Sequence, residues 1–117
     1  MSPPHHTLLL TVRDEEAREM MAMLLELSGF KVATAGCVAE CLRLANDLHP
    51  SAVLADVGDD EALNLPEKLR MPIIALTGQV RKRDTLHATG FAAVFIKPYA
   101  DMDLRAEIDR VIVSKRV

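Results

Sequence analysis

The sequence predicts an α/β fold in which a parallel sheet of five strands carries helices on both faces. Three observations predict it. Five short apolar segments alternate along the chain with segments whose apolar residues recur at helical spacing. The apolar segments contain few polar residues, as expected of parallel strands that are covered on both faces. The length of 117 residues, of which 50% are hydrophobic, suits one domain with one sizeable core.

The first strand and helix follow a short polar segment. Residues 1–6 contain two prolines and no apolar run, which predicts a disordered tail ahead of a domain spanning residues 7–117. Thr7–Val12 is an apolar run with β-branched members and predicts a buried strand. Asp14 is placed to cap a helix that runs to about Ser28. The residues of this helix expected to face inward are Ala17, Met21, Leu24 and Leu25.

The second strand is predicted over Phe30–Ala35, followed by a turn at Gly36. A helix comes next and is stopped by Pro50. Its apolar positions are Val38, Leu42, Ala45 and either Leu48 or His49. The third apolar run, Ser51–Ala55, predicts a buried strand that ends at Asp56.

The connection from the third strand to the fourth is short. Fifteen residues separate Asp56 from Pro72 (72 − 56 − 1), which is close to the roughly 10–12 residues that a crossover with its helix requires. Pro66 interrupts this segment and is tolerated only in a first helical turn. The third helix is therefore expected to be a single turn at Pro66–Arg70, or to be missing.

The last part of the chain predicts two more strands and two helices. The strands are Pro72–Thr77 and Phe91–Ile96, and a short helix over Arg83–Thr89 lies between them and closes at Gly90. Asp101 is expected to cap the last helix. The inward-facing residues of that helix are Leu104, Ile108 and either Val111 or Ile112.

The composition argues against several classes of function. The chain has 14 Lys and Arg against 17 Asp and Glu, a net charge of −3, which argues against direct contact with nucleic acid or with a membrane surface. Aromatic residues make up 3% of the chain, so platforms that stack bases or flat cofactors are scarce. The sequence has no signal-peptide core and no apolar run long enough to span a membrane, so a cytoplasmic protein is expected.

The two cysteines, Cys37 and Cys41, are too few for a disulfide framework. They are expected to be small, reduced and buried thiols on one face of a helix. A metal or redox pair is the alternative, but a zinc site needs more ligands than His49 alone would add.

Three polar residues follow three different predicted strands. Asp56 follows the third strand, Thr77 ends the fourth and Lys97 follows the fifth. Ligand sites of open α/β sheets lie at the carboxyl ends of the strands, so we expect these three residues to converge. A carboxylate that can accept a phosphoryl group, beside an ammonium and a hydroxyl, indicates phosphoryl chemistry.

Over about residues 7–113 the chain resembles the receiver domains of two-component response regulators. The residues that carry the resemblance are Asp56, Thr77-Gly78, Lys97-Pro98, Gly29-Phe30 and Gly90. The resemblance implies a flavodoxin-like, doubly wound sheet of order 2-1-3-4-5 and a signalling protein that is not an enzyme. It also implies that Asp56 is at the phospho-acceptor position, that Thr77 is the switch hydroxyl and that Lys97 is the family's lysine.

The sequence departs from this family at the metal site. The family usually has two adjacent acidic residues at the end of its first strand, and they hold Mg²⁺; here those positions fall on Val12 and Arg13. Mg²⁺ binds through carboxylates and waters, so no metal or other cofactor is expected. Asp14 and Asp56 are the expected ligands only if Mg²⁺ binding is retained. Arg13 is the candidate to replace the metal, holding Asp56 ionised and locked together with Lys97.

A second departure concerns the aromatic residue that often lies three positions before the lysine in this family. Val94 is at that position, so coupling between Thr77 and an aromatic side chain is not expected. Phe95 points to the opposite face of its strand and does not substitute for it.

These observations lead to one expectation and two alternatives. The expectation is an atypical receiver domain that acts in phosphorelay signalling by protein–protein interaction, with Mg²⁺-dependent phosphorylation of Asp56 weak or lost. The first alternative is a working response regulator that a histidine kinase phosphorylates on Asp56, with Asp14 or Glu15 rescuing the metal site. The second is a small flavodoxin-like cofactor-binding protein, although the five glycines form no phosphate-binding motif.

The expected partner is a histidine kinase or another signalling protein. The family resemblance implies that the face made by the fourth helix, the fifth strand and the fifth helix contacts an output domain or a second copy of the chain. The basic run Arg81-Lys82-Arg83 lies at the start of that region.

Overall fold

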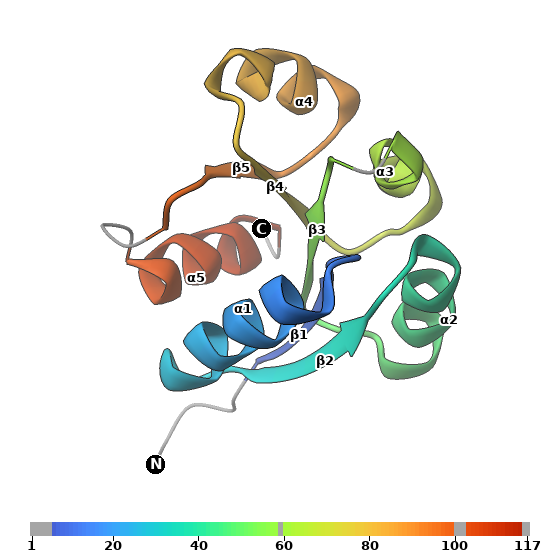
Figure 1. Ribbon diagram of the computed structural model, residues 1–117. Helices are drawn as coiled ribbons and strands as arrows, with labels where there is room; N and C mark the ends of the chain where they lie inside the picture. The colour runs from blue at the N-terminus through green and yellow to red at the C-terminus, as the bar shows by residue number, and fades with distance from the viewer. Residues whose placement is uncertain (1–5, 59, 100–102, 116–117) are drawn as a thin grey trace.

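The computed structural model describes residues 6–58, 60–99 and 103–115 and confirms the α/β fold (Figure 1). The five strands are β1 (Thr7–Thr11), β2 (Lys31–Ala35), β3 (Ala52–Asp56), β4 (Ile73–Thr77) and β5 (Ala93–Ile96). The α-helices are α1 (Glu15–Leu27), α2 (Val38–Leu48), α3 (Leu65–Lys68), α4 (Arg83–Thr89) and α5 (Leu104–Lys115). Two 3₁₀ helices, η1 (Asp60–Asn64) and η2 (Val80–Lys82), precede α3 and α4.

Neighbouring strands are all parallel and lie in the order β2-β1-β3-β4-β5, which confirms the predicted order. From β1 the chain first moves outward to β2 and then returns to pair β3 against the other side of β1. This reversal places a topological switch between β1 and β3, and ligands bind outside the carboxyl ends of the strands at such a switch.

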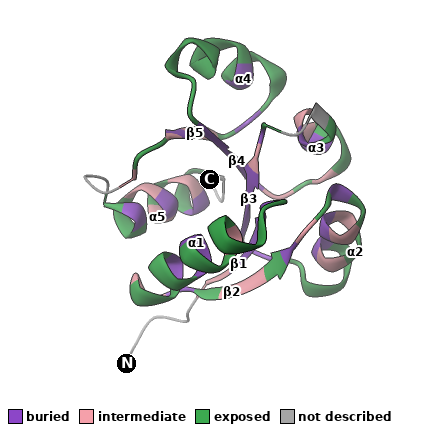
Figure 2. Cartoon of the chain, in the orientation of Figure 1, coloured by how far each residue is buried: buried purple, intermediate pink, exposed green. Residues whose placement is uncertain are grey.

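Helices cover both faces of the sheet (Figure 1). On one face α1 and α5 pack against alternate strand residues such as Leu8, Leu10 and Leu54, whereas α2, α3 and α4 pack on the other face against Leu9 and Val53. The three central strands are almost entirely buried (Figure 2). The edge strands β2 and β5 are half-exposed, so the expectation of strands covered on both faces is wrong there. An edge strand has a neighbour on one side only, and the helices do not extend fully over it.

Helix α1 buries a face that is rotated relative to the predicted one. Asp14 caps the helix as predicted, because its Oδ2 accepts a hydrogen bond of 2.8 Å from the backbone N–H of Ala17. The buried residues of α1 are Met21, Ala22 and Leu25. Ala17 and Leu24, which were predicted to face inward, are exposed. The helix has apolar residues on two adjacent faces, and spacing alone does not decide which of them meets the sheet.

The strands β2 and β5 begin later than predicted because the phenylalanines before them belong to helix caps. Gly29 and Gly90 adopt positive φ angles of 101° and 113° at the ends of α1 and α4. In the first of these turns the N–H of Phe30 donates to the carbonyl oxygen of Leu25 at 3.2 Å. In the second, the N–H of Phe91 donates to the carbonyl oxygen of Leu86 at 3.3 Å. Both phenylalanines are buried and anchor the caps to the core.

The third helix is short, as predicted. It spans Leu65–Lys68, whereas the sequence predicted a turn at Pro66–Arg70. Pro66 is the second residue of the helix. A backbone N–H at this position would have no acceptor within the helix, so proline is tolerated there. The 3₁₀ helix η1 precedes it and was not predicted, because single 3₁₀ turns have no distinctive apolar period.

Helix α5 packs against the core through the predicted residues Leu104, Ile108 and Ile112, which are buried, and Val111 is partly buried beside them. Asp101, predicted to cap this helix, lies outside the described residues. Within them, Asp103 caps the helix, and its Oδ1 accepts from the N–H of Ala106 at 3.1 Å.

Residues 1–5 of the predicted tail also lie outside the described part of the chain. His6 is held at the start of β1, where its carbonyl oxygen accepts from the N–H of Lys31 at 3.1 Å. Its ring nitrogen Nδ1 lies 3.2 Å from the hydroxyl of Ser51.

In residues 6–58, 60–99 and 103–115, no helix combines the length and the apolar character needed to cross a membrane. The longest of these helices, α1, has 13 residues, against the roughly 20 that a spanning helix needs.

Candidate functional site

The sheet brings the three predicted site residues to one edge. Asp56 is the last residue of β3, Thr77 is the last residue of β4, and Lys97 directly follows β5. The strand register aligns Asp56 with Leu76 and Thr77 with Ile96. The amino group of Lys97 donates to Oδ2 of Asp56 at 3.0 Å, so residues 41 positions apart in the chain are in direct contact.

The Asp56 carboxylate has a donor on each oxygen. Lys97 binds Oδ2, and the backbone N–H of Gly58 donates to Oδ1 at 2.8 Å. A Cβ at position 58 would lie 3.1 Å from that same oxygen, so glycine allows this close approach. The side chains of Lys97 and Asp56 are 46% and 26% exposed, so the ion pair is screened by water and orients the carboxylate more than it stabilises the fold.

Thr77 is buried, and its hydroxyl oxygen accepts a hydrogen bond from the backbone N–H of Gln79 at 3.0 Å. Its carbonyl oxygen accepts from the N–H of Lys97 at 2.9 Å, which fixes the start of the loop after β5. A threonine hydroxyl that accepts one hydrogen bond still has a proton to donate. Thr77 therefore holds its turn and keeps a donor at this edge of the sheet.

Val94 and Phe95 lie on opposite faces of β5. Val94 packs with the cluster under α2, α3 and α4, whereas Phe95 is buried with the cluster under α1 and α5. Phe95 is therefore directed away from the face on which Val94 lies.

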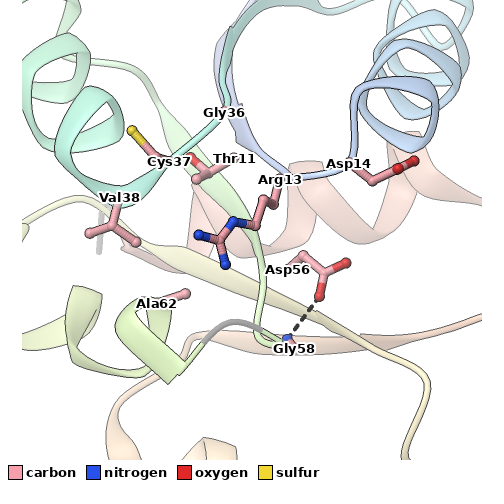
Figure 3. A pocket seen from close by; sticks show the side chains of 9 residues that line it. All are labelled: Thr11, Arg13, Asp14, Gly36, Cys37, Val38, Asp56, Gly58 and Ala62. Carbon is pink, nitrogen blue, oxygen red and sulfur yellow. Dashed lines mark hydrogen bonds between the residues drawn. The ribbon is translucent and has the colours of Figure 1, made fainter.

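A pocket of about 210 Å³ opens beside Asp56, between the ends of β1, β2 and β3 (Figure 3). The residues that line it are Thr11, Arg13, Asp14, Gly36, Cys37, Val38, Asp56, Gly58 and Ala62. The pocket thus lies at the switch point of the sheet, where the fold predicts a ligand site.

Backbone contacts hold the end of β1 on one side of this pocket. Val12 is buried, and its N–H donates to the carbonyl oxygen of Ala35 at 3.2 Å. The guanidinium of Arg18 reaches back from α1 and donates to the carbonyl oxygens of Val12 and Arg13 at 2.9 Å and 3.3 Å. The two positions at which the family resemblance places acidic residues are therefore ordered, and both lack a carboxylate.

Mg²⁺ takes about six oxygen ligands in near-octahedral geometry. The described side chains around Asp56 do not provide a set of carboxylates that fits this requirement. Asp14 uses Oδ2 to cap α1, and Figure 3 shows its side chain pointing away from Asp56. Arg13 brings a positive charge to the same pocket. Within the described residues no group of three Asp, Glu, His or Cys side chains is placed to hold a metal ion.

The guanidinium of Arg13 extends into the pocket. Figure 3 shows it directed toward Val38 and Ala62, while the carboxylate of Asp56 points toward Gly58. The ion pair between Arg13 and Asp56 stays a prediction.

The cysteines differ in their exposure. Both are free thiols; Cys37 is exposed at the N-cap of α2 and lines the pocket, whereas Cys41 is buried one turn later. The expectation of two buried thiols on one helix face is therefore wrong for Cys37, which lies outside the helix proper. Burial raises the pKa of the Cys41 thiol, and the neighbouring hydroxyl of Thr11 partly offsets that rise.

Tyr99 is a site residue that the sequence did not single out. It follows the cis peptide bond between Lys97 and Pro98, and its hydroxyl is buried without a hydrogen-bond partner in the described structure. Burial raises the pKa of the Tyr99 phenol above its usual value, and the negative charge of Asp56 raises it further. The only signal in the sequence is that the chain's single tyrosine lies two positions after Lys97.

Replacing this tyrosine by phenylalanine is expected to raise the free energy of unfolding at neutral pH by up to about 1 kcal/mol, because Tyr99→Phe removes a buried, unpaired hydroxyl. The raised pKa means that the folded state favours the neutral phenol. The contribution of the neutral Tyr99 phenol to the free energy of unfolding is complete below 10.0, the pKa of the phenol in the unfolded chain. This contribution is lost as the pH rises above that value. Denaturation curves from about pH 7 to about pH 11 measure the effect. Equal losses of stability above pH 10 in both proteins would contradict this prediction.

Structures similar to this chain are receiver domains and response regulators. CheY4, a chemotaxis response regulator of Vibrio cholerae, is 23% identical with a TM-score of 0.74, covering 92% of this chain and 99% of that chain. A response regulator from Desulfuromonas acetoxidans is 22% identical with a TM-score of 0.77, covering 93% and 98%. The signal receiver domain of a modulated diguanylate cyclase from Desulfovibrio desulfuricans G20 is 24% identical with a TM-score of 0.80, covering 97% and 98%.

At these sequence identities the likeness establishes that the chain has the flavodoxin-like receiver fold. No protein-family model and no curated protein matches the sequence.

Proposed function

We propose that the chain is an atypical receiver domain that transmits signals by protein–protein interaction and takes up a phosphoryl group on Asp56 weakly or not at all. The observation that carries the proposal is the end of β1, where Val12 and Arg13 stand at the positions of the family's acidic pair. The acid next to them, Asp14, is committed to capping α1.

Charge explains why phosphorylation of Asp56 would be poor. Transfer of a phosphoryl group to a carboxylate requires cations that neutralise charge on the transferring oxygens. Lys97 supplies one such cation in contact with Asp56. Arg13 supplies a second in the pocket, but a fixed guanidinium does not bridge the attacking carboxylate and the phosphoryl oxygens as a divalent ion does.

A working receiver is the alternative, and the intact Asp56–Lys97 pair with Thr77 nearby favours it. In that case an acid must leave its present role to hold the metal. Asp14 would break the cap of α1, at a cost of about 0.5–2 kcal/mol. Glu15 lies in the first turn of α1, is exposed, and does not line the pocket.

A flavodoxin-like cofactor binder is less well supported. The pocket at the switch point has a volume of about 210 Å³, below the roughly 300 Å³ at which sites for larger organic ligands begin. Among the residues that the structure describes, no aromatic side chain lines it. A flat cofactor would find neither the room nor a stacking partner there.

Two exposed surfaces favour action through protein partners. Helix α1 presents an apolar stripe to solvent, and Figure 2 shows that much of this helix is exposed. Its residues are Met20, Met23, Leu24 and Leu27, and they are 45–79% exposed. Exposed apolar patches of this kind mark interaction sites. The partner proposed for this signalling domain is a histidine kinase or another cytoplasmic signalling protein.

The second surface is a groove of about 530 Å³ between α4, β5 and α5. Its lining combines charged residues, Arg83 and the ion pair of Arg110 with Glu107 at 3.2 Å, with the apolar residues Phe95 and Val111. We propose this face as the contact for an output domain or for a second copy of the chain.

Intact-mass measurement after incubation with a small acyl phosphate, with and without Mg²⁺, tests the proposed function. The expected result is little or no phosphoryl adduct in either condition. An Asp56→Ala variant is the control for modification elsewhere. A Mg²⁺-dependent adduct on the wild type that is absent from the control would support the working receiver instead.

A further inference from the structure

A groove of about 640 Å³ lies between the second half of α2 and the segment that joins α3 to β4. Its lining residues, between positions 42 and 49 and at positions 68–71, come shortly before β3 and β4 in the chain. The groove therefore lies toward the amino ends of these parallel strands, whereas Asp56 and Thr77 are at their carboxyl ends. A ligand in this groove would leave the Asp56 site and its pocket free.

The shortness of α3 leaves this side of α2 uncovered. At a rise of about 1.5 Å per residue, the four residues of α3 span about 6 Å, against about 17 Å for the 11 residues of α2. The two helices are neighbours on the same side of the sheet (Figure 1), and after Lys68 the chain is extended rather than helical. Three apolar side chains, Leu42, Leu69 and Met71, are partly buried against the core and form the apolar part of the lining.

The rim of the groove is basic. Arg43, Lys68 and Arg70 line it and are exposed. None of the three forms an ion pair with another described residue. Among the residues that the structure describes, no Asp or Glu lines the groove, and Asp47 and Glu67, on the same two helices, lie outside its lining. Three cations therefore share one concave surface without a compensating carboxylate in it.

The fold does not offset this positive charge. The carboxyl end of α2 is at the groove and carries roughly half a negative charge, which is small against three full positive charges. The chain as a whole has a net charge of −3, so the groove is opposite in sign to the molecule that carries it. Like charges held together repel one another, and an anionic ligand would relieve that repulsion.

The groove fits an acidic segment of a protein better than nucleic acid or a membrane. None of its described lining residues is aromatic, so bases find no stacking platform. Membrane-binding basic clusters have about four to eight Lys and Arg on an exposed segment, whereas this lining is concave and has three. An acidic peptide supplies carboxylates for the rim together with aliphatic side chains that pack on Leu42, Leu69 and Met71.

We propose that the groove between α2 and the α3–β4 segment docks an acidic, extended segment of a partner protein, whose carboxylates pair with Arg43, Lys68 and Arg70. This contact requires neither phosphorylation nor a metal ion at Asp56, so it is independent of the function proposed above. It would let the domain hold one partner at the amino ends of its strands while the Asp56 edge stays open to another.

Selection from a phage-displayed library of random short peptides, on the immobilised wild-type chain, tests this docking site. The expected result is enrichment of peptides that combine several Asp or Glu with one or two aliphatic residues. The most enriched peptide is then titrated into the ¹⁵N-labelled chain. Its amide shifts are expected to saturate and to be largest at residues 42–49 and 68–71, and its affinity is expected to fall as salt is added.

Charge reversal at two of the three cations is the decisive variant. Arg43→Glu combined with Arg70→Glu is expected to weaken the selected peptide by about tenfold or more, because two attractions become repulsions. Arg43→Gln alone is expected to weaken it by roughly twofold to fivefold, as for one exposed charge pair. Arg81→Gln removes an exposed arginine of η2 outside the groove and should bind as the wild type does. Thermal unfolding of each variant checks that these exposed substitutions leave the fold intact.

Enrichment of acidic peptides whose binding depends on Arg43 and Arg70 would support the docking site. Failure to enrich acidic peptides, or equal weakening by Arg43→Gln and Arg81→Gln, would overturn it. Single-stranded oligouridylate and vesicles of phosphatidylcholine with phosphatidylserine are titrated in parallel. Tighter binding of either probe than of the selected peptide, dependent on the same arginines, would overturn the assignment to a protein segment.

Discussion

Arg13→Asp is expected to create Mg²⁺ binding beside Asp56 and to raise the rate of phosphoryl uptake from an acyl phosphate by roughly 10²-fold or more. A bound metal ion contributes several kcal/mol to the stabilisation of transition-state charge, and each 1.36 kcal/mol is a factor of ten in rate. The substitution places a carboxylate at the end of β1 and removes a cation from the pocket at the same time. Val12→Asp added to it should increase the effect, although Val12 is buried and the double variant will be less stable.

The controls separate gain of a ligand from loss of a charge. Arg13→Asn removes the cation without adding a carboxylate and is expected to leave phosphorylation low. Asp56→Asn in the Arg13→Asp background removes the acceptor and should abolish the adduct. The measurement is intact mass against time, with and without Mg²⁺. Equal rates for Arg13→Asp and Arg13→Asn would show that the missing carboxylate is not what limits Asp56.

The second large effect concerns the core under the site. Leu54→Ala is expected to lower the free energy of unfolding by about 2–5 kcal/mol, because it leaves a cavity on the central strand β3. Leu54 is fully buried and pairs in register with Leu10 and Ile74 on the two neighbouring strands. A loss of that size is a large fraction of the roughly 5–15 kcal/mol that stabilises a typical domain.

The matched control for this change is Leu27→Ala, which removes the same atoms from the exposed stripe of α1. We expect that variant to differ from the wild type by less than about 0.5 kcal/mol. Chemical denaturation of the three proteins measures both effects. A comparable loss in the two variants would contradict the packing described for β3 and α1.

The residues alone were sufficient to predict the parallel sheet and the meeting of Asp56 with Lys97, whereas the order of the strands was implied by the family resemblance. Five apolar runs separated by helical segments leave few topologies, and parallel strands must bring their carboxyl ends to one edge. Any polar residue placed just after such a strand is therefore located by the topology itself. The positions of Gly29 and Gly90 followed in the same way, because a left-handed residue is needed to end each helix.

Other features depended on contacts that spacing does not encode. Helix α1 has two adjacent apolar faces, and only packing decides that Met21 and Leu25 are buried while Met20 and Leu27 are exposed. The environment of Tyr99 depends on the path of the chain after Pro98, which no periodic pattern describes. The direction of the Arg13 side chain likewise depends on its rotamer and on the surrounding loops.

Calorimetric titration of the wild-type chain with Mg²⁺, with Asp56→Asn as the reference, tests most directly whether this receiver fold has lost its metal site. We expect no saturable heat in either protein at millimolar Mg²⁺. Stoichiometric binding to the wild type that disappears in Asp56→Asn would contradict it, and would mean that nearby acids have rebuilt the site around Arg13.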